Sequence, residues 1–395
     1  MIDTDVLVVG AGPTGLALAT FLQKEGVDHL LIDALPEGQS TSRAGVVHPH
    51  TLEVLDSLGV VGELHAQGLP VDKFTVRDRD QALLTIGFEH LPSAFKHILM
   101  IPQPSTERTL EQAHERLGGM LLRNAKATNF RFESDHVVVS LDRDGKEQHV
   151  RAKYVVGADG MHSTVRAATD IRFEGAAYAE SFVLADVHMD WPLGQSEVSL
   201  CFSGAGLVVV APLPDGTYRI VATMDQAPEK PNIRDVQRLL DERGPKARPA
   251  KVRDIIWSSR FRVHHRLASS YRDGRILLMG DAAHVHSPAG GQGMNTGLVD
   301  AILLGKALTA VVRDHEPVST LDDYSNVRRP AAEEVLALAG RLTRMATVRS
   351  PVLRHFRNLV LRLLDHVSPF KTKLALQLSG ISRRQLSALP AVGQA

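Results

Sequence analysis

The chain has 395 residues, of which 44% are hydrophobic and 23% charged, and its 45 basic residues equal its 45 acidic ones. This length suits two domains, or one large domain that carries an insertion. Because the formal net charge is zero, no overall field draws the chain to nucleic acid, and no nucleic-acid partner is expected. The single cysteine, Cys201, excludes an intrachain disulfide, a cysteine-rich zinc site and a CxxC redox pair.

The N-terminus enters a strand-like run too early for a secretory signal peptide. No uninterrupted apolar run approaches the roughly 18 residues that cross a bilayer. We therefore expect a cytoplasmic protein without integral membrane association.

The first motif follows a short valine-rich run, residues 5–9, which is typical of a buried parallel strand. The run leads directly into GAGPTG, a GxGxxG spacing. An amphipathic stretch, 16–24, predicts a helix that ends at Gly26, and a second strand, 27–32, ends in Asp33. The pattern predicts a dinucleotide cradle made by Gly10, Ala11, Gly12, Pro13, Thr14, Gly15 and Asp33.

Each residue type in this cradle has a physical role. Gly10 permits the tight turn, Gly12 lets the backbone approach a pyrophosphate, and Gly15 lets helix and strand pack closely. The helix N-terminus offers unpaired N–H groups to phosphates, and Asp33 is placed to accept hydrogen bonds from a ribose. An ordinary βαβ turn is the alternative, and the motif does not separate NAD from FAD.

Two further strand–turn–acid units follow. In YVVGADGMHSTVR, residues 154–166, a strand over 154–156 ends at a turn that holds Asp159, and a helix begins near Ser163. In RILLMGDAAHVHSPAGGQGMNTG, residues 275–297, a strand over 276–279 breaks at Gly280 and Asp281, and a loop rich in proline and glycine precedes a helix over about 293–308. Three such units suit a ligand as long as FAD.

With these three motifs in this order, residues 3–345 resemble the group A FAD-dependent aromatic hydroxylases, the family of para-hydroxybenzoate hydroxylase. The resemblance implies that Asp281 hydrogen-bonds the ribityl chain of FAD. It also implies that the PAGGQGMN loop wraps the flavin ring through Pro288, Gly290, Gly291, Gly293, Met294 and Asn295. The positive end of the following helix would stabilise the anion of reduced flavin, with backbone N–H groups of 293–295 as donors. A simple helix cap is the alternative.

Other positions carry over from the resemblance. Arg43 resembles the arginine that lies against the FAD pyrophosphate, and Gln103 the glutamine near the ribityl chain. Asp159 and Arg166 resemble residues tied to FAD and to nicotinamide-cofactor binding. Read alone, Arg43 is a solvated loop residue and Gln103 caps a helix.

No second complete GxGxxG is present, because SGAGLVVV at 203–210 lacks the third glycine and is more typical of a strand start. The resemblance implies that NADPH or NADH docks transiently, without a domain of its own. Residues 179–265 alternate short apolar runs with turns and predict an antiparallel sheet inserted between the FAD motifs. We expect an FAD-binding domain of residues 1–72, 98–178 and 266–345, a substrate domain of 73–97 and 179–265, and a helical segment of 346–395.

His48 is the candidate for acid–base catalysis on the substrate, because an unperturbed histidine titrates near neutrality. The alternative is that it caps the next helix or packs beside the flavin loop. His264 and His265 are adjacent on a strand, so their side chains face opposite sides and no metal site is expected. Cys201 is interpreted as an inert core residue. The basic amphipathic helix near 354–367 is expected to pack on the body with its basic face in solvent, membrane or partner contact being the alternative.

The fold class expected is α/β, a doubly wound FAD domain with an inserted β-sheet domain and C-terminal helices. The function expected is hydroxylation of a small aromatic molecule, phenolic or polycyclic, by FAD, NAD(P)H and O2 through a flavin hydroperoxide. A halogenase or double-bond reductase on the same scaffold is an alternative, and a non-catalytic FAD-binding interaction protein is another. A homodimer is compatible with the sequence.

Overall fold

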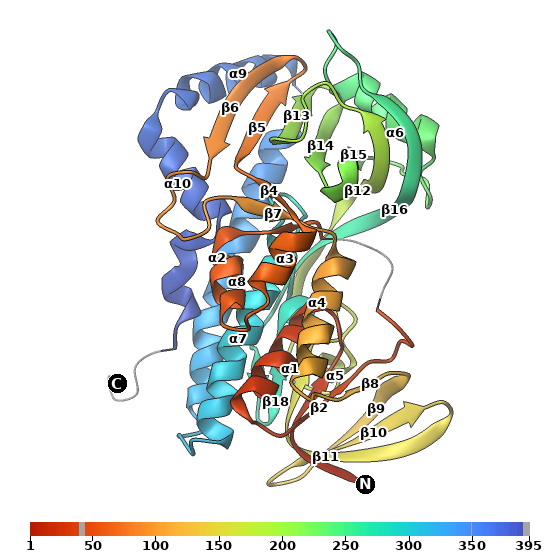
Figure 1. The fold of residues 1–395 in the computed structure, drawn as a ribbon, viewed down its shortest axis with the longest axis vertical. Coiled ribbons are helices and arrows are strands. Elements are labelled where there is room, and N and C mark those ends of the chain that lie inside the picture. The colour runs from red at the N-terminus through yellow and green to blue at the C-terminus, as the bar shows by residue number, and fades with distance from the viewer. Residues whose placement is uncertain (39–43, 349, 390–395) are drawn as a thin grey trace.

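The computed structural model describes residues 1–38, 44–348 and 350–389. Within these residues the strands form two sheets of eight strands and one of three. Figure 1 shows an elongated molecule with one large sheet toward each end and the C-terminal helices along one flank.

The first sheet has a parallel centre. Its path runs β17 (Arg272–Asp273), β18 (Ile276–Leu278), β11 (Lys146–Gly157), β1 (Ile2–Val9), β2 (His29–Ile32) and β8 (Leu121–Leu122). The strands from β18 to β8 are parallel, and β17 is antiparallel to its neighbour. Two further antiparallel strands, β9 (Ala125–Phe132) and β10 (Val137–Arg143), extend from β11. The sequence did not predict this second branch.

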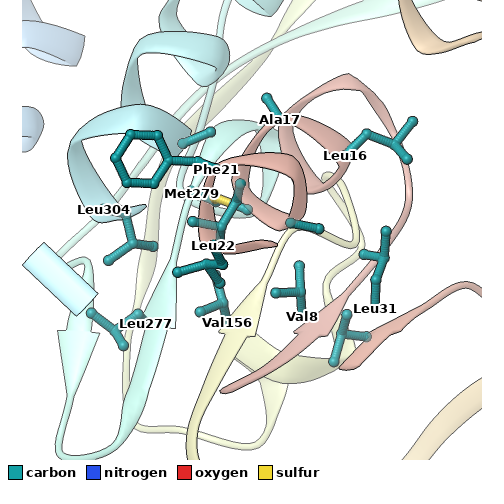
Figure 2. Packing of buried hydrophobic residues seen from close by; sticks show 14 of the residues in the cluster. Val8, Leu16, Ala17, Phe21, Leu22, Leu31, Val156, Leu277, Met279 and Leu304 are labelled. Carbon is teal, nitrogen blue, oxygen red and sulfur yellow. The ribbon is translucent and has the colours of Figure 1, made fainter. Parts of the chain in front are cut away.

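Helix α7 (Gln292–Val312) is the central helix of this half of the molecule. It packs between α1 (Pro13–Glu25) and α8 (Thr320–Ala346), and α4 (Gln103–Arg116) packs on the other side of α1. By length and composition α7 is apolar enough to cross a membrane, but 78% of its most apolar stretch is buried inside the protein. Figure 2 shows the reason, since Leu304 of α7 and Leu22 of α1 meet Val8, Val156 and Leu277 of the sheet. It is a core helix.

The second sheet lies at the other end of the molecule. Its order is β19 (His284–Val285), β16 (Lys251–Ala268), β12 (Phe173–Asp190), β15 (Tyr218–Met224), β14 (Gly206–Pro212), β13 (Val198–Ser203), β5 (Lys73–Asp78) and β6 (Gln81–Gly87). Helix α6 (Ile233–Arg243) covers one face, where the alternate residues Val183, Ala185 and Val187 are buried. The antiparallel pairing expected for residues 179–265 is confirmed, and β5, from outside that segment, adds to β13 in parallel.

A small third sheet joins the two halves. It consists of β3 (Val46–Val47), β7 (Ile98–Met100) and β4 (Leu69–Val71). In the chain, the helices α2 (Pro49–Asp56) and α3 (Val61–Gln67) lie between β3 and β4. The α/β fold class is thus confirmed. The helix expected near Ser163 is a single turn, α5 (Thr164–Ala167), and η1 (Pro214–Gly216) and η2 (Gly280–Ala282) are short 3₁₀ turns.

The C-terminal helices are α9 (Pro351–Asp365) and α10 (Ser368–Leu378), followed by the 3₁₀ segment η3 (Ile381–Ser387). The expectation of a solvated basic face on α9 holds for Arg362 and is wrong for Arg357. Arg357 is buried, and Phe356 beside it is 65% exposed. The reason is tertiary, because the Arg357 guanidinium donates to the carbonyls of Met345 and Phe202, which no helical periodicity reveals.

Candidate active site

The register of the first sheet brings the three sequence motifs to one edge. Val9 pairs with Gly157, and Gly157 with Leu278, so three parallel strands end side by side. The chain leaves each strand through its motif. The Ala158 N–H donates to the Val9 carbonyl at 2.8 Å, which ties the first two turns together. This carboxyl edge is where doubly wound folds bind their ligands.

The glycines of the first motif meet different surroundings. Gly10 has φ +105°, and a Cβ there would lie 2.5 Å from the Ala158 carbonyl oxygen. A Cβ on Gly15 would lie 1.8 Å from the Gly10 oxygen, so only glycine lets α1 pack this closely on the turn. A Cβ on Gly12 would meet no protein atom within 4 Å. Gly12 therefore borders open space at the start of α1, where the amides of Thr14 and Gly15 have no intrahelical acceptor. This is the geometry that a pyrophosphate requires.

Thr14 fixes the first motif against the third. A Cβ on Gly280 would lie 2.9 Å from Thr14 Oγ1, and a Cβ on Gly297 would lie 2.6 Å from the same atom. The Thr14 side chain therefore fills the space between η2 and α7. Thr14 and Gly297, which are 283 positions apart in the sequence, pack together at this point.

Asp33 lies at the end of β2, as expected. Its Oδ2 accepts the Ala11 N–H at 2.6 Å and its Oδ1 accepts the Leu35 N–H at 2.8 Å. The carboxylate thus shapes the first turn, and each oxygen keeps a lone pair for a further donor.

The second motif is held by Asp159 and Arg166. Asp159 Oδ2 accepts the Thr164 N–H at 2.7 Å and so caps α5, whereas its Oδ1 is buried and finds no hydrogen-bond donor in the described parts of the chain. Arg166 donates to the Met161 and Ala282 carbonyls, both at 2.7 Å. Burial lowers the pKa of Arg166. Arg166 thereby links the second motif to the third.

The loop predicted to wrap the flavin ring, residues 288–295, turns sharply into α7. Gly290 and Gly291 have φ +85° and +64°. Asn295 Oδ1 accepts the His48 N–H at 2.7 Å, and its Nδ2 donates to the Val46 and Gly291 carbonyls at 3.0 and 2.8 Å. The Asn295 side chain thus fastens residues 44–48, hereafter the strap, to the start of α7. Because Gly291 is the N-cap, the amides of Gly293 and Met294 are in the first helical turn and have no intrahelical acceptor.

His48 packs under this loop. Its Nε2 lies 2.9 Å from the Gly290 carbonyl oxygen, and its buried Nδ1 has no partner among the described residues. Although His48 is the N-cap residue of α2, its side chain makes no capping hydrogen bond. Burial is the main cause that lowers the pKa of His48 to about 4, and the nearby Arg383 charge contributes. The ring is therefore neutral near pH 7, with Nε2–H as donor to Gly290.

The remaining predicted residues lie around the same edge. Gln103 begins α4, accepts the Ala44 N–H through Oε1 at 3.0 Å and donates to Glu107 at 2.8 Å. The Asp281 side chain is exposed at the carboxyl edge, in η2. Arg43 lies outside the described residues.

A buried ionic network that sequence reasoning missed supports the third motif. Asp300 of α7 accepts from His284 Nε2 at 2.6 Å and from the Gly280 N–H at 3.2 Å through Oδ2, and from Arg328 Nε at 2.7 Å through Oδ1. Burial favours a raised pKa for Asp300, but the Arg328 and His284 interactions outweigh it and lower the pKa. The signal in the sequence that could have revealed this network is Asp300, an acidic residue among the apolar residues of a core helix.

The C-terminal segment reaches the same loop. Arg383 of η3 donates to Gln292 Oε1 at 2.9 Å, and Gln292 Nε2 donates to the Gly290 carbonyl at 3.1 Å and to the Leu378 carbonyl at 2.9 Å. Burial lowers the pKa of Arg383 to about 10. Residues near the end of the chain therefore help to hold the loop in place.

The second sheet contacts the strap through Arg219. Its Nε and Nη2 donate to the two oxygens of Asp186 at 2.8 and 2.7 Å, and its Nη1 donates to the Ala44 carbonyl at 2.5 Å. Both side chains are largely buried. The strap is thus bound on one side by the sheet and on the other by α7.

Together the glycine cradle, the helix N-termini of α1 and α7, the exposed Asp281 and the unpaired Asp159 Oδ1 fit an extended dinucleotide that spans three motifs. The fold and the site define a dinucleotide-binding protein of the doubly wound α/β class. Comparison with known proteins identifies its family.

Residues 3–339 match the family model of the FAD binding domain. The chain is 37% identical to 6-methylpretetramide 4-monooxygenase of Streptomyces rimosus over 376 residues, which cover 93% of this chain and 67% of that protein. It is similar to the structure of the anhydrotetracycline hydroxylase OxyS from the same species, with 32% identity, a TM-score of 0.81, and coverage of 100% and 78% of the two chains. The p-nitrophenol 4-monooxygenase PnpA of Pseudomonas putida DLL-E4 shares the fold, with a TM-score of 0.89, 24% identity, and coverage of 99% and 100%.

The chain belongs to this FAD-binding family and is an FAD-dependent aromatic hydroxylase, a flavin-dependent monooxygenase. The resemblance stated from the three motifs is confirmed. The roles of the individual site residues stay predictions.

Proposed function

We propose that the enzyme takes electrons from NADPH or NADH and hydroxylates a phenolic or polycyclic aromatic compound with O2. FAD supplies the electron transfer and the oxygen chemistry when it is bound. The observation that supports the proposal is the packing of Thr14 of the first motif against Gly280 and Gly297, which lie before and after the 288–295 loop in the chain. The names of two relatives, which refer to 6-methylpretetramide and anhydrotetracycline, support a polycyclic substrate.

The cofactor contacts proposed divide into four groups. The pyrophosphate and ribose would contact the first cradle, Gly10 to Gly15 with Asp33, together with Arg43. The ribityl chain would contact Asp281 and Gln103. Asp159 and Arg166 would serve the binding of FAD and of the nicotinamide cofactor. The ring would contact the loop and first helical turn, namely Pro288, Gly290, Gly291, Gly293, Met294 and Asn295. The amides at the start of α7 would favour negative charge on the ring.

The second sheet offers an apolar wall for a flat substrate. Leu200, Val209, Val221 and Leu184 stand in register across four adjacent strands. Leu200, Val209 and Val221 are only half-buried, and they share a face with Arg219, which contacts the strap. We propose that these four residues contact the aromatic substrate.

We also propose the division of the chain that the sequence predicts. The substrate domain comprises 73–97 and 179–265, the FAD domain comprises 1–72, 98–178 and 266–345, and the helical segment comprises 346–395.

His48 can serve hydroxylation in two ways. Its hydrogen bond to the Gly290 carbonyl supports a positioning role for the flavin loop. Its unpaired Nδ1 and its neutral state near pH 7 leave open a proton-accepting role. We propose the positioning role, since the ring is buried under the loop.

The test is substrate-stimulated NADPH oxidation by the FAD-loaded protein, with phenolic and polycyclic compounds as probes and mass detection of one added oxygen atom. A product that carries oxygen from ¹⁸O2 is expected. Halide incorporation without oxygen transfer would favour a halogenase, reduction of the probe without O2 would favour a reductase, and FAD binding without turnover by any probe would favour an interaction protein.

A further inference from the structure

Helix α9 presents its apolar side to solvent. Val352, Phe356, Leu359, Leu363 and Val367 lie at spacings of four, three, four and four residues, so they form one row along the helix and its C-terminal extension. Their exposed fractions are 77, 65, 48, 60 and 42%. We call these five residues the apolar row. Figure 1 places α9 at the outer edge of the molecule, beside β6.

The inward side of the same helix buries Leu361 and makes specific polar bonds. Arg357 donates to the Phe202 carbonyl at 3.2 Å, and Asn358 donates to Asp78 at 2.6 Å. Asp365 accepts a backbone N–H of β6 at 2.9 Å. A rotation that buried the apolar row would break all of these bonds. These hydrogen bonds of Arg357, Asn358 and Asp365 therefore keep the apolar row turned toward solvent.

The charge around the apolar row is strongly positive. Residues 341–374 contain eight basic residues and one acidic residue, a net charge of +7, in a chain whose total is zero. Arg344, Arg362 and Lys373 are exposed. The one acidic residue, Asp365, is bonded to β6 and to Lys371.

A convex apolar row flanked by cations has the chemistry of a helix that lies in the plane of an anionic bilayer. A second copy of the chain fits less well. A two-fold pair of α9 helices would bring two regions of like positive charge together, including the exposed Arg344, Arg362 and Lys373 of each copy. A helix of 15 residues is also only about 22 Å long, too short for its pairing alone to bury a standard interface.

We propose that the apolar row of α9 and the surrounding cations dock the enzyme on the surface of an anionic lipid bilayer. The side chains of the row enter the boundary between headgroups and acyl chains, and Arg344, Arg362 and Lys373 contact lipid phosphates. The polar side of α9 stays bonded to the protein.

The experiment is flotation of the FAD-loaded protein with vesicles of equal parts phosphatidylglycerol and phosphatidylcholine, and with vesicles of phosphatidylcholine alone. The test variant is Phe356→Ser/Leu359→Ser/Leu363→Ser. The matched control is Leu117→Ser/Phe132→Ser/Ile256→Ser, which removes three hydrophobic side chains that are 44, 52 and 55% exposed elsewhere. Circular dichroism and FAD content of both variants report folding, and light scattering reports the oligomeric state.

We expect the wild type and the control to float with the anionic vesicles, and the test variant to partition at least about tenfold less. Binding should weaken at about 1 M salt, where the Debye length is about 3 Å. Absence of wild-type flotation with anionic vesicles overturns the proposal. So does equal flotation of the test variant, or a dimer that the test variant alone dissociates, which would show that a second copy covers the row.

Discussion

Asp300 and Arg328 form an ion pair with 2.7 Å between Oδ1 and Nε, and neither side chain is more than 3% exposed. The pair joins α7 to α8, and the Gly280 N–H and His284 bind the other carboxylate oxygen. The third FAD motif is therefore anchored to the helical core by a buried charge. Removing one partner of such a pair leaves an uncompensated charge inside the protein.

Asp300→Ala is expected to lower the free energy of unfolding by about 3–5 kcal/mol, because Arg328 and His284 then lose their acceptor. Urea denaturation of the apoprotein measures the loss. Glu333→Ala is the matched control, since it removes the exposed partner of Arg329 and should cost no more than about 1 kcal/mol. Equal losses in the two variants would contradict the assigned importance of the buried pair.

Two glycine substitutions separate cofactor binding from folding. Gly12→Ala adds a Cβ that meets no protein atom within 4 Å, so the apoprotein should lose no more than about 1 kcal/mol. Its affinity for FAD should fall at least about tenfold, because the Cβ lies where the pyrophosphate approaches. Gly15→Ala places a Cβ 1.8 Å from the Gly10 oxygen and should destabilise the apoprotein itself. Fluorescence titration with FAD and thermal unfolding measure the two effects, and unchanged FAD affinity in Gly12→Ala would exclude the cradle.

Substitution of His48 distinguishes positioning from proton transfer. His48→Ala removes the donor to the Gly290 carbonyl, whereas His48→Gln can replace Nε2–H with its amide N–H. If the bond to the loop is what matters, His48→Gln should restore most of the coupling between NADPH oxidation and hydroxylation. Steady-state rates with product quantification measure the coupling. Equal losses in both variants, with a changed pH–rate profile, would favour the general-base role.

Stability should fall in mild acid because several histidines are buried in the neutral form. His48, His114 and His286 each have a pKa lowered to about 4, chiefly by burial, from an ordinary value of 6.5. Between these values the unfolded chain binds more protons than the folded one, so the free energy of unfolding decreases as the pH falls from 6.5 to 4. Each histidine contributes up to about 3 kcal/mol to this decrease.

Urea denaturation across this pH window checks the prediction. His114 packs against His29, with Glu111 nearby, away from the flavin loop. His114→Asn should therefore flatten the pH dependence, while His90→Asn, at a side chain that is 90% exposed, should leave it unchanged. An identical slope in His114→Asn and the wild type would refute the assignment.

Cys201 should be unreactive in the folded protein. It is fully buried in β13, and burial raises the pKa of its thiol to about 12. A disulfide reagent at pH 8 should label the chain only on unfolding, in step with the loss of native circular dichroism. Rapid labelling of the native protein would contradict this.

The α/β fold class and the FAD motifs were predictable from the sequence because their signals are local. The valine-rich run before Gly10, the spacing of Gly10, Gly12 and Gly15, and the acid at Asp33 describe one βαβ unit within some thirty residues. The Asp159 and Asp281 turns repeat the pattern of a strand followed by an acid. Parallel strands then bring these turns to one edge by geometry alone.

Other parts of the site depend on contacts between distant residues. The Asn295 side chain binds the His48 N–H across 247 positions, and Arg383 binds Gln292 across 91. The burial of Arg357 and the exposure of Phe356 likewise contradicted simple periodicity, and the parallel pairing of β13 with β5 joins segments more than 100 residues apart. Periodicity reports which face of an element is apolar, but not which neighbour that face meets.

The sequence by itself was enough to predict an extended dinucleotide site at the carboxyl edge of a parallel sheet, because glycine conformation and helix termini act over a few residues. Only the tertiary structure decided how the flavin loop is held, through Asp300, His48 and Arg383, and which side of α9 faces outward. Those outcomes depend on the desolvation and pairing of charges from separate segments, which are defined only once the chain has folded.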